Sequence, residues 1–177
     1  MDIRKISLSD QLAFLDFEDE LLEDKRHNPF VEWWPVEDFE DFVMRSDMSD
    51  IKQSGQHNPT YTRYFAFVEG AIAGFVICFW EMTHPDCLKL GHIGYIVAPS
   101  FRHQGVAQSL IAFALKQYRS LGIDSVLVVA HEKNNPSRRL IEKLGGQLLA
   151  LEMVNHLGRN LETARYELQG ASLKYDE

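Results

Sequence analysis

The sequence predicts a single α/β (α+β) domain with one mixed central sheet of about seven strands and helices on both faces. The expected order is β-α-α-β-β-β-α-β-α-β-β. The chain of 177 residues has the length of one domain and shows no repeat or Pro/Gly/Ser-rich linker. A short turn joins two apolar runs in its first half, and longer helical patterns separate the strands in its second half. This mixture of hairpins and crossovers disfavours a uniform βαβ alternation of the Rossmann kind.

Four strands and two helices are expected in the first half of the chain. Apolar runs bounded by turn residues place the strands at residues 3–6, 64–68, 72–80 and 92–97. Ser9 or Asp10 can cap a first helix, and Pro35 suits the first turn of a second. The first helix is expected to carry its apolar face on these leucines: Leu12, Leu15, Leu21 and Leu22. The segment 84–86 is expected only to interrupt the strand pattern.

The second half is expected to alternate helices with strands before it ends in a strand pair. Residues 105–121 have the apolar spacing of a well-buried helix, which Gly122 ends. The continuous apolar run at 126–130 is typical of a central strand covered on both faces. A short helix at 137–144 stops at Gly145-Gly146, and residues 147–154 and 163–168 are expected to form the final strands.

Composition and charge exclude several classes of partner. The net charge is −8, with fifteen Asp/Glu against five Lys/Arg in residues 1–50 and eleven against thirteen in the remainder. Nucleic acid requires a basic stripe and is a poor partner, and no apolar run reaches the roughly 18 residues that cross a membrane. A cationic ligand would suit the first third and an anionic one the rest, unless the acidic third is only a soluble surface. The start lacks a secretory signal, and Cys78 and Cys87 make no disulfide framework, so a cytoplasmic location is expected.

The stretch from Ile96 to Ala107 is the most informative part of the sequence. A strand ends, the chain turns, and a helix begins at two small residues, Gly105 and Ala107. The first amides of a helix have no partner within it and lie at the positive end of its dipole, which suits a pyrophosphate. Arg102 adds a charged fork and Ser109 a hydroxyl. The stretch is not a P-loop, and by itself such a turn could be a purely structural joint.

Two motifs together resemble a known family. Arg102-x-x-Gly105-x-Ala107 resembles the cofactor motif of the GNAT superfamily of N-acetyltransferases. The segment from Asn134 to Gly145 resembles the second signature of that superfamily, and the two lie about thirty residues apart with one helix and one strand between them. Gly91-His92-Ile93-Gly94-Tyr95 is similar to a branch of bacterial GNAT proteins described only as acetyltransferases. The resemblance covers roughly residues 91–150 and implies a GNAT-like fold over 1–177.

The resemblance implies acetyl-coenzyme A as the co-substrate and no metal. The implied coenzyme A site consists of Ile96, Val97, Ala98, Arg102, His103, Gln104, Gly105, Val106, Ala107, Ser109, Asn134, Ser137 and Arg138. The amides of residues 104–107 would hold the pyrophosphate. Residues 96–98 would pair with the pantetheine arm and polarise the thioester carbonyl, and the strand at 126–131 would form the other wall. Asn134 would contact the pantetheine or the adenosine side.

The resemblance further implies direct attack of an amine on the thioester, but it leaves the proton transfers open. Many GNAT proteins place a tyrosine before the Glu-Lys-x-Gly sequence as the acid, where this chain has Ile141. Tyr166, Tyr95 and Ser137 are alternative acids. His92 is the first candidate base, against the alternative that its ring pairs with a neighbouring carbonyl. Glu81 is the second, against the alternative of a solvated turn residue.

The acceptor is expected to be a primary amine of a small molecule or a peptide. Aromatic and acidic side chains that could receive it cluster in one loop, although the same loop could simply be tied to the core: Phe30, Trp33, Trp34, Glu32, Glu37 and Asp38. His84, Cys87 and His92 match no zinc spacing. The alternatives to an enzyme are a non-catalytic coenzyme A-binding module and an unrelated protein whose Gly105 turn binds another phosphorylated ligand. Dimers are frequent among similar proteins, so a homodimer is an open alternative.

Overall fold

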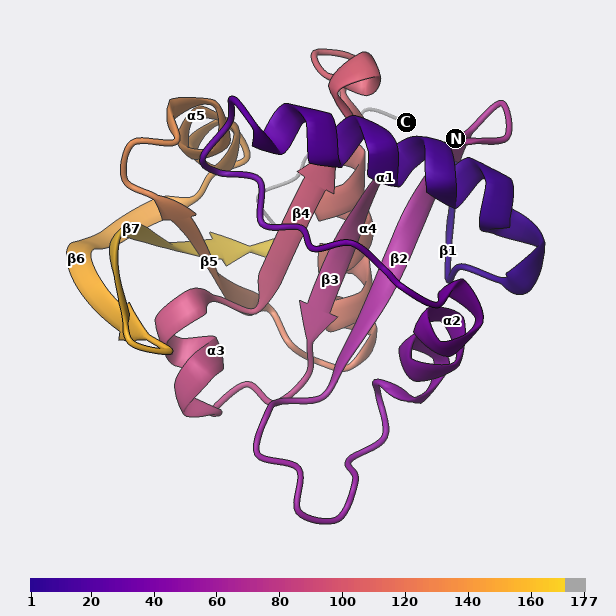
Figure 1. Ribbon diagram of the computed structural model, residues 1–177. Coiled ribbons are helices and arrows are strands. Elements are labelled where there is room, and N and C mark those ends of the chain that lie inside the picture. The colour runs from indigo at the N-terminus through magenta and orange to yellow at the C-terminus, as the bar shows by residue number, and fades with distance from the viewer. Residues whose placement is uncertain (171–177) are drawn as a thin grey trace.

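The computed structural model describes residues 1–170, which form one seven-stranded mixed sheet (Figure 1). The strand order is β1-β2-β3-β4-β5-β7-β6, in which only β4 and β5 are parallel. The strands are β1 (Asp2–Arg4), β2 (Tyr61–Val68), β3 (Ala71–Phe79), β4 (Ile93–Val97), β5 (Ser125–His131), β6 (Gln147–His156) and β7 (Arg159–Gln169). The helices are α1 (Gln11–Lys25), α2 (Phe39–Met48), α3 (Pro85–Leu90), α4 (Val106–Ser120) and α5 (Asn135–Lys143). The predicted fold class is confirmed.

Helices cover both faces of the sheet. In Figure 1, α1 and α2 lie in front of β2 and β3, and α4 lies behind them. Phe14, Phe17 and Phe65 belong to the core of the front face, whereas Leu110 and Ile141 belong to that of the back face. Within the described part of the chain, no helix is long and apolar enough to cross a membrane.

The first strand is shorter than predicted, because a charged turn ends it. β1 pairs with β2 only over Asp2–Arg4, and not to Ile6. The Arg4 guanidinium donates to both Asp10 carboxylate oxygens at 2.8 Å, and that carboxylate also accepts from the Ser7 amide at 2.8 Å. The Arg4 guanidinium, followed by the Ser7 donors, lowers the pKa of Asp10 to about 2, although partial burial opposes this. These bonds to Asp10 stabilise the turn that leads the chain from β1 to α1.

We expect Asp10→Ala to destabilise the protein in a pH-dependent way. A carboxyl whose pKa falls from about 4 to about 2 on folding contributes about 2–3 kcal/mol to the free energy of unfolding. Because the folded-state pKa is depressed, this contribution is complete above about pH 4 and is lost as the pH falls toward about 2. Urea denaturation at neutral pH and at several acid pH values measures it. A gap between variant and wild type that does not narrow in acid would contradict this account.

α1 buries phenylalanines where leucines were expected. Phe14, Phe17 and Leu21 are at most 1% exposed, whereas Leu12 is 79% and Leu15 46% exposed. The predicted apolar face of this helix is therefore wrong, except at Leu21 and the half-buried Leu22. The buried residues follow the same i, i+3, i+4 spacing, and the larger rings occupy the core side.

The segment between α1 and α2 is an extended loop, and α2 begins later than predicted. Asp38 caps α2 by accepting from the Asp41 amide at 3.0 Å, so Pro35 precedes the helix. Buried Glu18 of α1 holds the loop, since its carboxylate accepts from Trp33 Nε1 at 2.8 Å and from the Val36 amide at 2.9 Å. These bonds engage the amides of the loop outside any helix.

α3 was not predicted. His84 caps it by accepting from the Asp86 amide at 3.1 Å, and Pro85 takes its first position. A His-Pro-Asp sequence was interpreted as a break in the pattern, although proline at the first position of a helix is favourable. α3 carries the chain from the end of β3 to the start of β4 and contacts β5.

Candidate functional site

β4 and β5 diverge in the middle of the sheet. They share a single parallel pair, Ile93 with Val128. Beyond it, β4 pairs only with β3 up to Val97, and β5 pairs only with β7 up to His131. Figure 1 shows the two strands spreading apart from their shared end. The splayed strands implied by the resemblance are therefore present, with β5 as the second wall of the gap.

The free edge of β4 offers hydrogen-bonding groups to this gap. The Ala98 amide donates to Ala73 O of β3 at 2.9 Å, and the His92 carbonyl accepts from the Phe79 amide at 2.9 Å. Because the bonding direction alternates along a strand, Tyr95 and Val97 direct their main-chain groups toward the gap instead, although the Val97 carbonyl already accepts from Arg102 Nε. Of the three residues predicted to meet the pantetheine, Val97 faces the gap, and Ile96 and Ala98 pair with β3.

The loop before α4 and the first turn of that helix carry a run of free main-chain amides at residues 103–108, which we call the amide cup. Within the described chain, no protein group accepts a hydrogen bond from the main-chain amides of residues 103–108. Gly105 caps α4 in the left-handed conformation, with φ of +81°, and His103 also has a positive φ of +62°. A Cβ built on Gly105 would meet nothing within 4 Å. The predicted anion site, with Gln104, Val106 and Ala107 beside Gly105, therefore has open donors at the positive end of a 15-residue helix.

Arg102 faces away from this cup. Its guanidinium forms a forked ion pair with Asp24 of α1, with Nη1 and Oδ1 3.2 Å apart, and its Nε donates to Val97 O at 3.3 Å. The same guanidinium lowers the pKa of Asp24. Arg102 thus ties α1 to the loop, and the cation expected beside the pyrophosphate is engaged elsewhere. His103 is exposed next to the cup, and Ser109 is half-buried on the next turn.

The first turn of α5 lies on the β5 side of the gap. Asn134 caps this helix by accepting from the Ser137 amide at 3.3 Å. Arg138 is held by three groups: its Nε donates to Tyr166 Oη at 2.8 Å, its Nη1 donates to Glu132 O at 3.0 Å, and its Nη2 lies 3.9 Å from Glu142. Arg138 therefore braces α5 against β7.

The candidate acids Tyr95 and Tyr166 have different hydrogen-bond partners. Tyr95 of β4 reaches α5, where its hydroxyl lies 2.7 Å from Ser137 Oγ. Burial raises the pKa of the Tyr95 phenol, so it keeps its proton at neutral pH. Tyr166 is fully buried and donates to Glu142 at 2.7 Å while accepting from Arg138. Ile141 is fully buried in the back core.

His92 is enclosed by main-chain partners. Its Nδ1 accepts from the Leu127 amide at 2.8 Å, which fixes the proton on Nε2, and Nε2 donates to Met82 O at 2.9 Å. Burial lowers the pKa of this imidazole, although the Met82 bond opposes the shift. His92 is 3% exposed. The ring holds the shared end of β4 and β5 together and has no free nitrogen to accept a proton.

Glu81 has partners on the loop before β2. Its carboxylate accepts from Lys52 Nζ at 2.8 Å and from the Thr60 amide at 2.9 Å, and these bonds lower its pKa. Glu81 follows β3, whose pairing with β4 runs from Gly74–Val97 to Cys78–Ile93. It therefore lies at the end of the sheet opposite the amide cup, near the shared end of β4 and β5.

His131 is a titratable residue at the gap that the sequence reasoning did not select. It ends β5, three residues beyond the shared pair and so level with Ile96 across the gap. Its Nε2 lies 3.7 Å from Glu32, and its ring centroid lies 5.5 Å from that of Phe30. The sequence signal was its position at the end of a central strand next to the second motif. The sequence reasoning used the strand at 126–131 only as the other wall of the gap and gave His131 no part in proton transfer.

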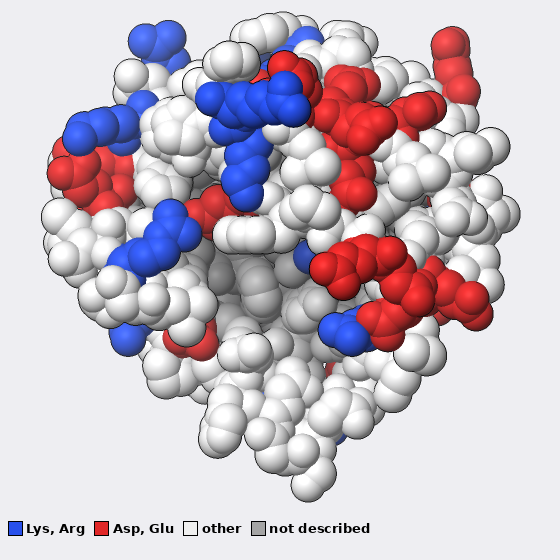
Figure 2. All heavy atoms as spheres, viewed as in Figure 1, with Lys and Arg blue, Asp and Glu red and all other residues white. Residues whose placement is uncertain are grey.

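The aromatic loop divides between core and surface. Trp33 is 5% exposed and packs on Phe14 and Phe75, whereas Trp34 is 62% exposed beneath Lys25. Only Phe30 and Glu32 approach β5. Figure 2 shows acidic side chains over α1 and α2, and between α3 and α2 the face is hollowed. This hollow lies on the front face, onto which the gap opens.

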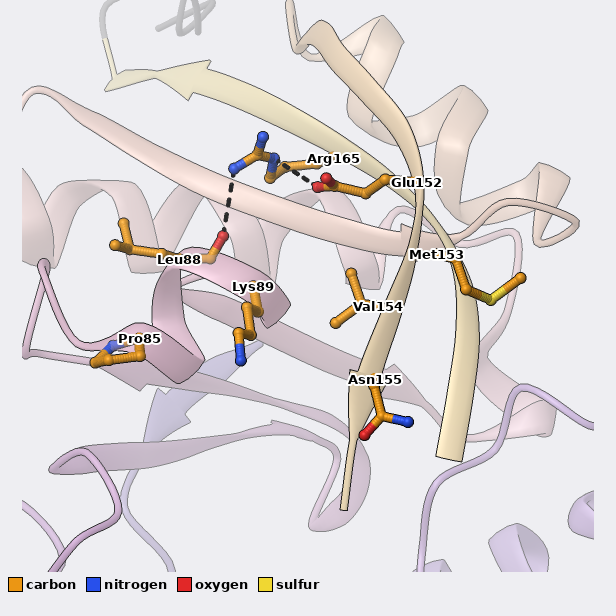
Figure 3. A pocket seen from close by; sticks show the side chains of 8 residues that line it. All are labelled: Pro85, Leu88, Lys89, Glu152, Met153, Val154, Asn155 and Arg165. Atoms are coloured by element: carbon orange, nitrogen blue, oxygen red, sulfur yellow. Dashed lines mark hydrogen bonds and ion pairs between the residues drawn. The ribbon is translucent and has the colours of Figure 1, made fainter. Parts of the chain in front are cut away.

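A cavity of about 520 Å³ lies between α3 and the β6–β7 pair (Figure 3). Arg165 closes it by an ion pair with Glu152 at 3.0 Å and a contact with Leu88 O at 3.5 Å. None of the predicted cofactor residues lines it. Among residues 1–170, no three His, Cys, Asp or Glu side chains gather as a metal site would require.

Comparisons with known proteins agree with this geometry. Mycothiol acetyltransferase of Thermomonospora curvata is 30% identical over 93 residues, which are 51% of this chain and 29% of that protein. The match thus spans less than a third of that relative. The structure of yncA from Salmonella typhimurium with its cofactor acetyl-CoA is 16% identical, covers 99% of this chain and 96% of its own, and gives a TM-score of 0.64. Ribosomal-protein-alanine N-acetyltransferase of Brucella melitensis is 16% identical, with coverages of 96% and 99% and a TM-score of 0.68.

Sequence identities of 16%, as for these two structures, establish only the fold. The model of the acetyltransferase (GNAT) family, in contrast, matches residues 20–146 of the sequence itself. That range runs from α1 to the end of the second motif and includes the amide cup, both walls of the gap and the first turn of α5. Because it makes up well over half of the chain, the protein belongs to the acetyltransferase (GNAT) family.

Proposed function

We propose that the protein transfers the acetyl group of acetyl-coenzyme A to a primary amine by direct attack. The observation that carries this proposal is that the free amides of residues 103–108 follow, within a few residues, the edge of β4 that β5 leaves unpaired. The cup suits a pyrophosphate, and an extended pantetheine arm can hydrogen-bond along a strand edge. The thioester would then lie between Val97 and the end of β5.

The main chain would supply most of the catalysis. The Val97 amide, directed into the gap, would donate to the oxygen that gains negative charge when the amine attacks the carbonyl carbon. Holding amine and thioester together lowers the entropy cost of the reaction. No covalent cysteine intermediate is needed, and burial raises the pKa of Cys87 to about 11 and that of Cys78 to about 12.

We assign His131 as the residue that accepts the proton of the amine. It stands at the β5 wall on the face from which an acceptor can enter, and its Nε2 lies 3.7 Å from the Glu32 carboxylate. Imidazole is the side chain best suited to exchange protons near neutral pH. His92 and Glu81 become weaker candidates, because their polar atoms already serve main-chain amides and carbonyls or Lys52.

We assign Tyr95, in contact with Ser137, as the group that protonates the leaving thiolate. We expect Tyr95→Phe to lower kcat about 10-fold or more, less than the usual contribution of about 10²–10⁴-fold from a general acid, because a thiolate is a tolerable leaving group. Tyr166→Phe should instead leave Arg138 and Glu142 short of a partner, lowering the free energy of unfolding by about 1–3 kcal/mol with little effect on kcat. Steady-state kinetics and thermal denaturation of both variants measure this. A larger loss of kcat in Tyr166→Phe would reverse the assignment.

Free-thiol release from acetyl-coenzyme A tests the activity itself. The purified protein is incubated with amino acids, short peptides, polyamines and aminosugars, and each product is identified by mass spectrometry. We expect at least one class of amine to release thiol well above the water background and to become acetylated. Tight coenzyme A binding without acetylation of any amine would favour the non-catalytic binding module.

A further inference from the structure

Arg63 of β2 is a cation without a counter-ion. Among residues 1–170, no hydrogen bond or ion pair to its guanidinium is present, and its buried Nε has no partner. Four aromatic rings surround the guanidinium carbon, with centroid distances of 5.0 Å to Phe75, 5.3 Å to Phe42, 5.7 Å to Trp33 and 5.9 Å to Tyr61. Among the described residues, the other arginines that no ion pair joins to a carboxylate are all exposed, whereas Arg63 is not: Arg119, Arg139 and Arg159.

A half-buried guanidinium whose Nε is enclosed without a hydrogen-bond partner is costly for the fold. Removing a cation from water disfavours its charged form, and burial accordingly lowers the pKa of Arg63. The faces of the aromatic rings compensate only in part for the water that the guanidinium loses, because they offer no hydrogen-bond acceptors in the plane of its N–H groups. The N–H groups of the Arg63 guanidinium therefore lack a hydrogen-bond acceptor within the described chain, and an external ligand could supply one.

The strand register places Arg63 on the acceptor side of the proposed active site. Arg63 pairs with Ile77 of β3, and Ile77 pairs with Gly94 of β4, the first residue beyond the shared end of β4 and β5. Directly paired residues point to the same face, which here is the front face, because Arg63 contacts Trp33 and Phe42. Two strand spacings of about 4.8 Å separate the main chains of Arg63 and Gly94, so the two residues lie about 10 Å apart on the same face of the sheet.

We propose that Arg63 binds a carboxylate of the acyl acceptor, so that the acceptor is a small amine that also carries a carboxylate, such as an amino acid or a short peptide. The inference rests on the proposed function, because it specifies which kind of amine the proposed active site accepts. The amine would lie at the gap, on the side of His131, and the carboxylate would take the bidentate geometry that a guanidinium fork favours. The surrounding rings would pack against the apolar part of the acceptor.

Binding of matched acids and amides tests this independently of turnover. Isothermal titration calorimetry on coenzyme A-saturated protein compares N-acetyl amino acids with their C-terminal amides. We expect the acids to bind at least 10-fold more tightly, and Arg63→Met to abolish this preference without changing the affinity for coenzyme A. Arg159→Met, at an exposed position of the β6–β7 hairpin, is the matched control and should keep it. Equal binding of acids and amides by the wild type, or a preference that survives Arg63→Met, would overturn the proposal.

A second variant and the activity assay complete the test. Arg63→Lys keeps the charge but loses the fork, so we expect the acid preference to fall at least 3-fold; an unchanged preference would count against bidentate binding. If Arg63→Met does not fold, the acid-over-amide binding preference of Arg63→Lys decides the test by itself. Acetylation of amines without any distinction between acid and amide would remove this inference and leave the catalytic proposal intact. Arg63-dependent binding of acids without acetylation would remove the catalytic proposal and leave this one.

Discussion

Gly105→Glu is expected to weaken coenzyme A binding at least about 100-fold while leaving the fold intact. Gly105 lies in the middle of the free amides, and a Cβ added there points into open space. A glutamate would therefore extend over the cup and bring a negative charge close to the pyrophosphate. Two unit charges about 5 Å apart repel by about 3 kcal/mol at an effective dielectric constant of about 20, which corresponds to about 100-fold in affinity. Isothermal titration calorimetry with coenzyme A measures the change.

Gly158→Glu is the matched control for this variant. Gly158 has a similar φ of +76°, and its built Cβ also meets nothing within 4 Å, but it lies in the turn between β6 and β7. The two substitutions share the backbone strain and the added charge, so they should lower the thermal midpoint similarly. Only Gly105→Glu should lose coenzyme A. Equal affinity in both variants would place the pyrophosphate elsewhere.

His131→Gln is expected to lower kcat about 100-fold with little change in the KM for acetyl-coenzyme A. Glutamine retains a polar side chain near Glu32 but cannot accept a proton at neutral pH, and general base catalysis is worth about 10²–10⁴-fold. Steady-state kinetics of the variant and the wild type measure both parameters.

His156→Gln serves as the control for this experiment. His156 lies at the end of β6, where it pairs with Arg159, and therefore on the edge strand away from the gap. We expect its kinetics to match those of the wild type. If His131→Gln kept the wild-type kcat, the assignment of the base would be wrong, whereas binding at the amide cup would be unaffected.

The sequence predicted the parts of the fold that depend on local chemistry. Apolar runs and turn residues located most of the strands, and Gly105 located the start of α4, whereas α5 begins at Asn135, two residues before the predicted start at residue 137. The gap between β4 and β5 followed from the family resemblance, since no residue pattern shows that two adjacent strands diverge. α3 was missed because His84-Pro85-Asp86 was interpreted only as a break.

The charged and polar partners could not be predicted, because they depend on contacts between distant segments. Arg102 was assigned to the pyrophosphate, but it meets Asp24, 78 residues away. His92 was assigned as a base, yet its two nitrogens are occupied by Leu127 and Met82. His131 and Arg63 carry no local motif, and only the alignment of strands brings them to the face of the proposed acceptor site.

The amide protons of the cup provide the most direct test of the central claim, that coenzyme A lies along the α4 loop and the edge of β4. Uniformly ¹⁵N-labelled protein is titrated with coenzyme A, and chemical-shift changes are recorded for every assigned amide. We predict the largest changes at Gln104, Gly105, Val106 and Ala107, followed by Val97, with small changes in the cavity between α3 and β6. Largest changes in that cavity, with the cup unaffected, would contradict the account.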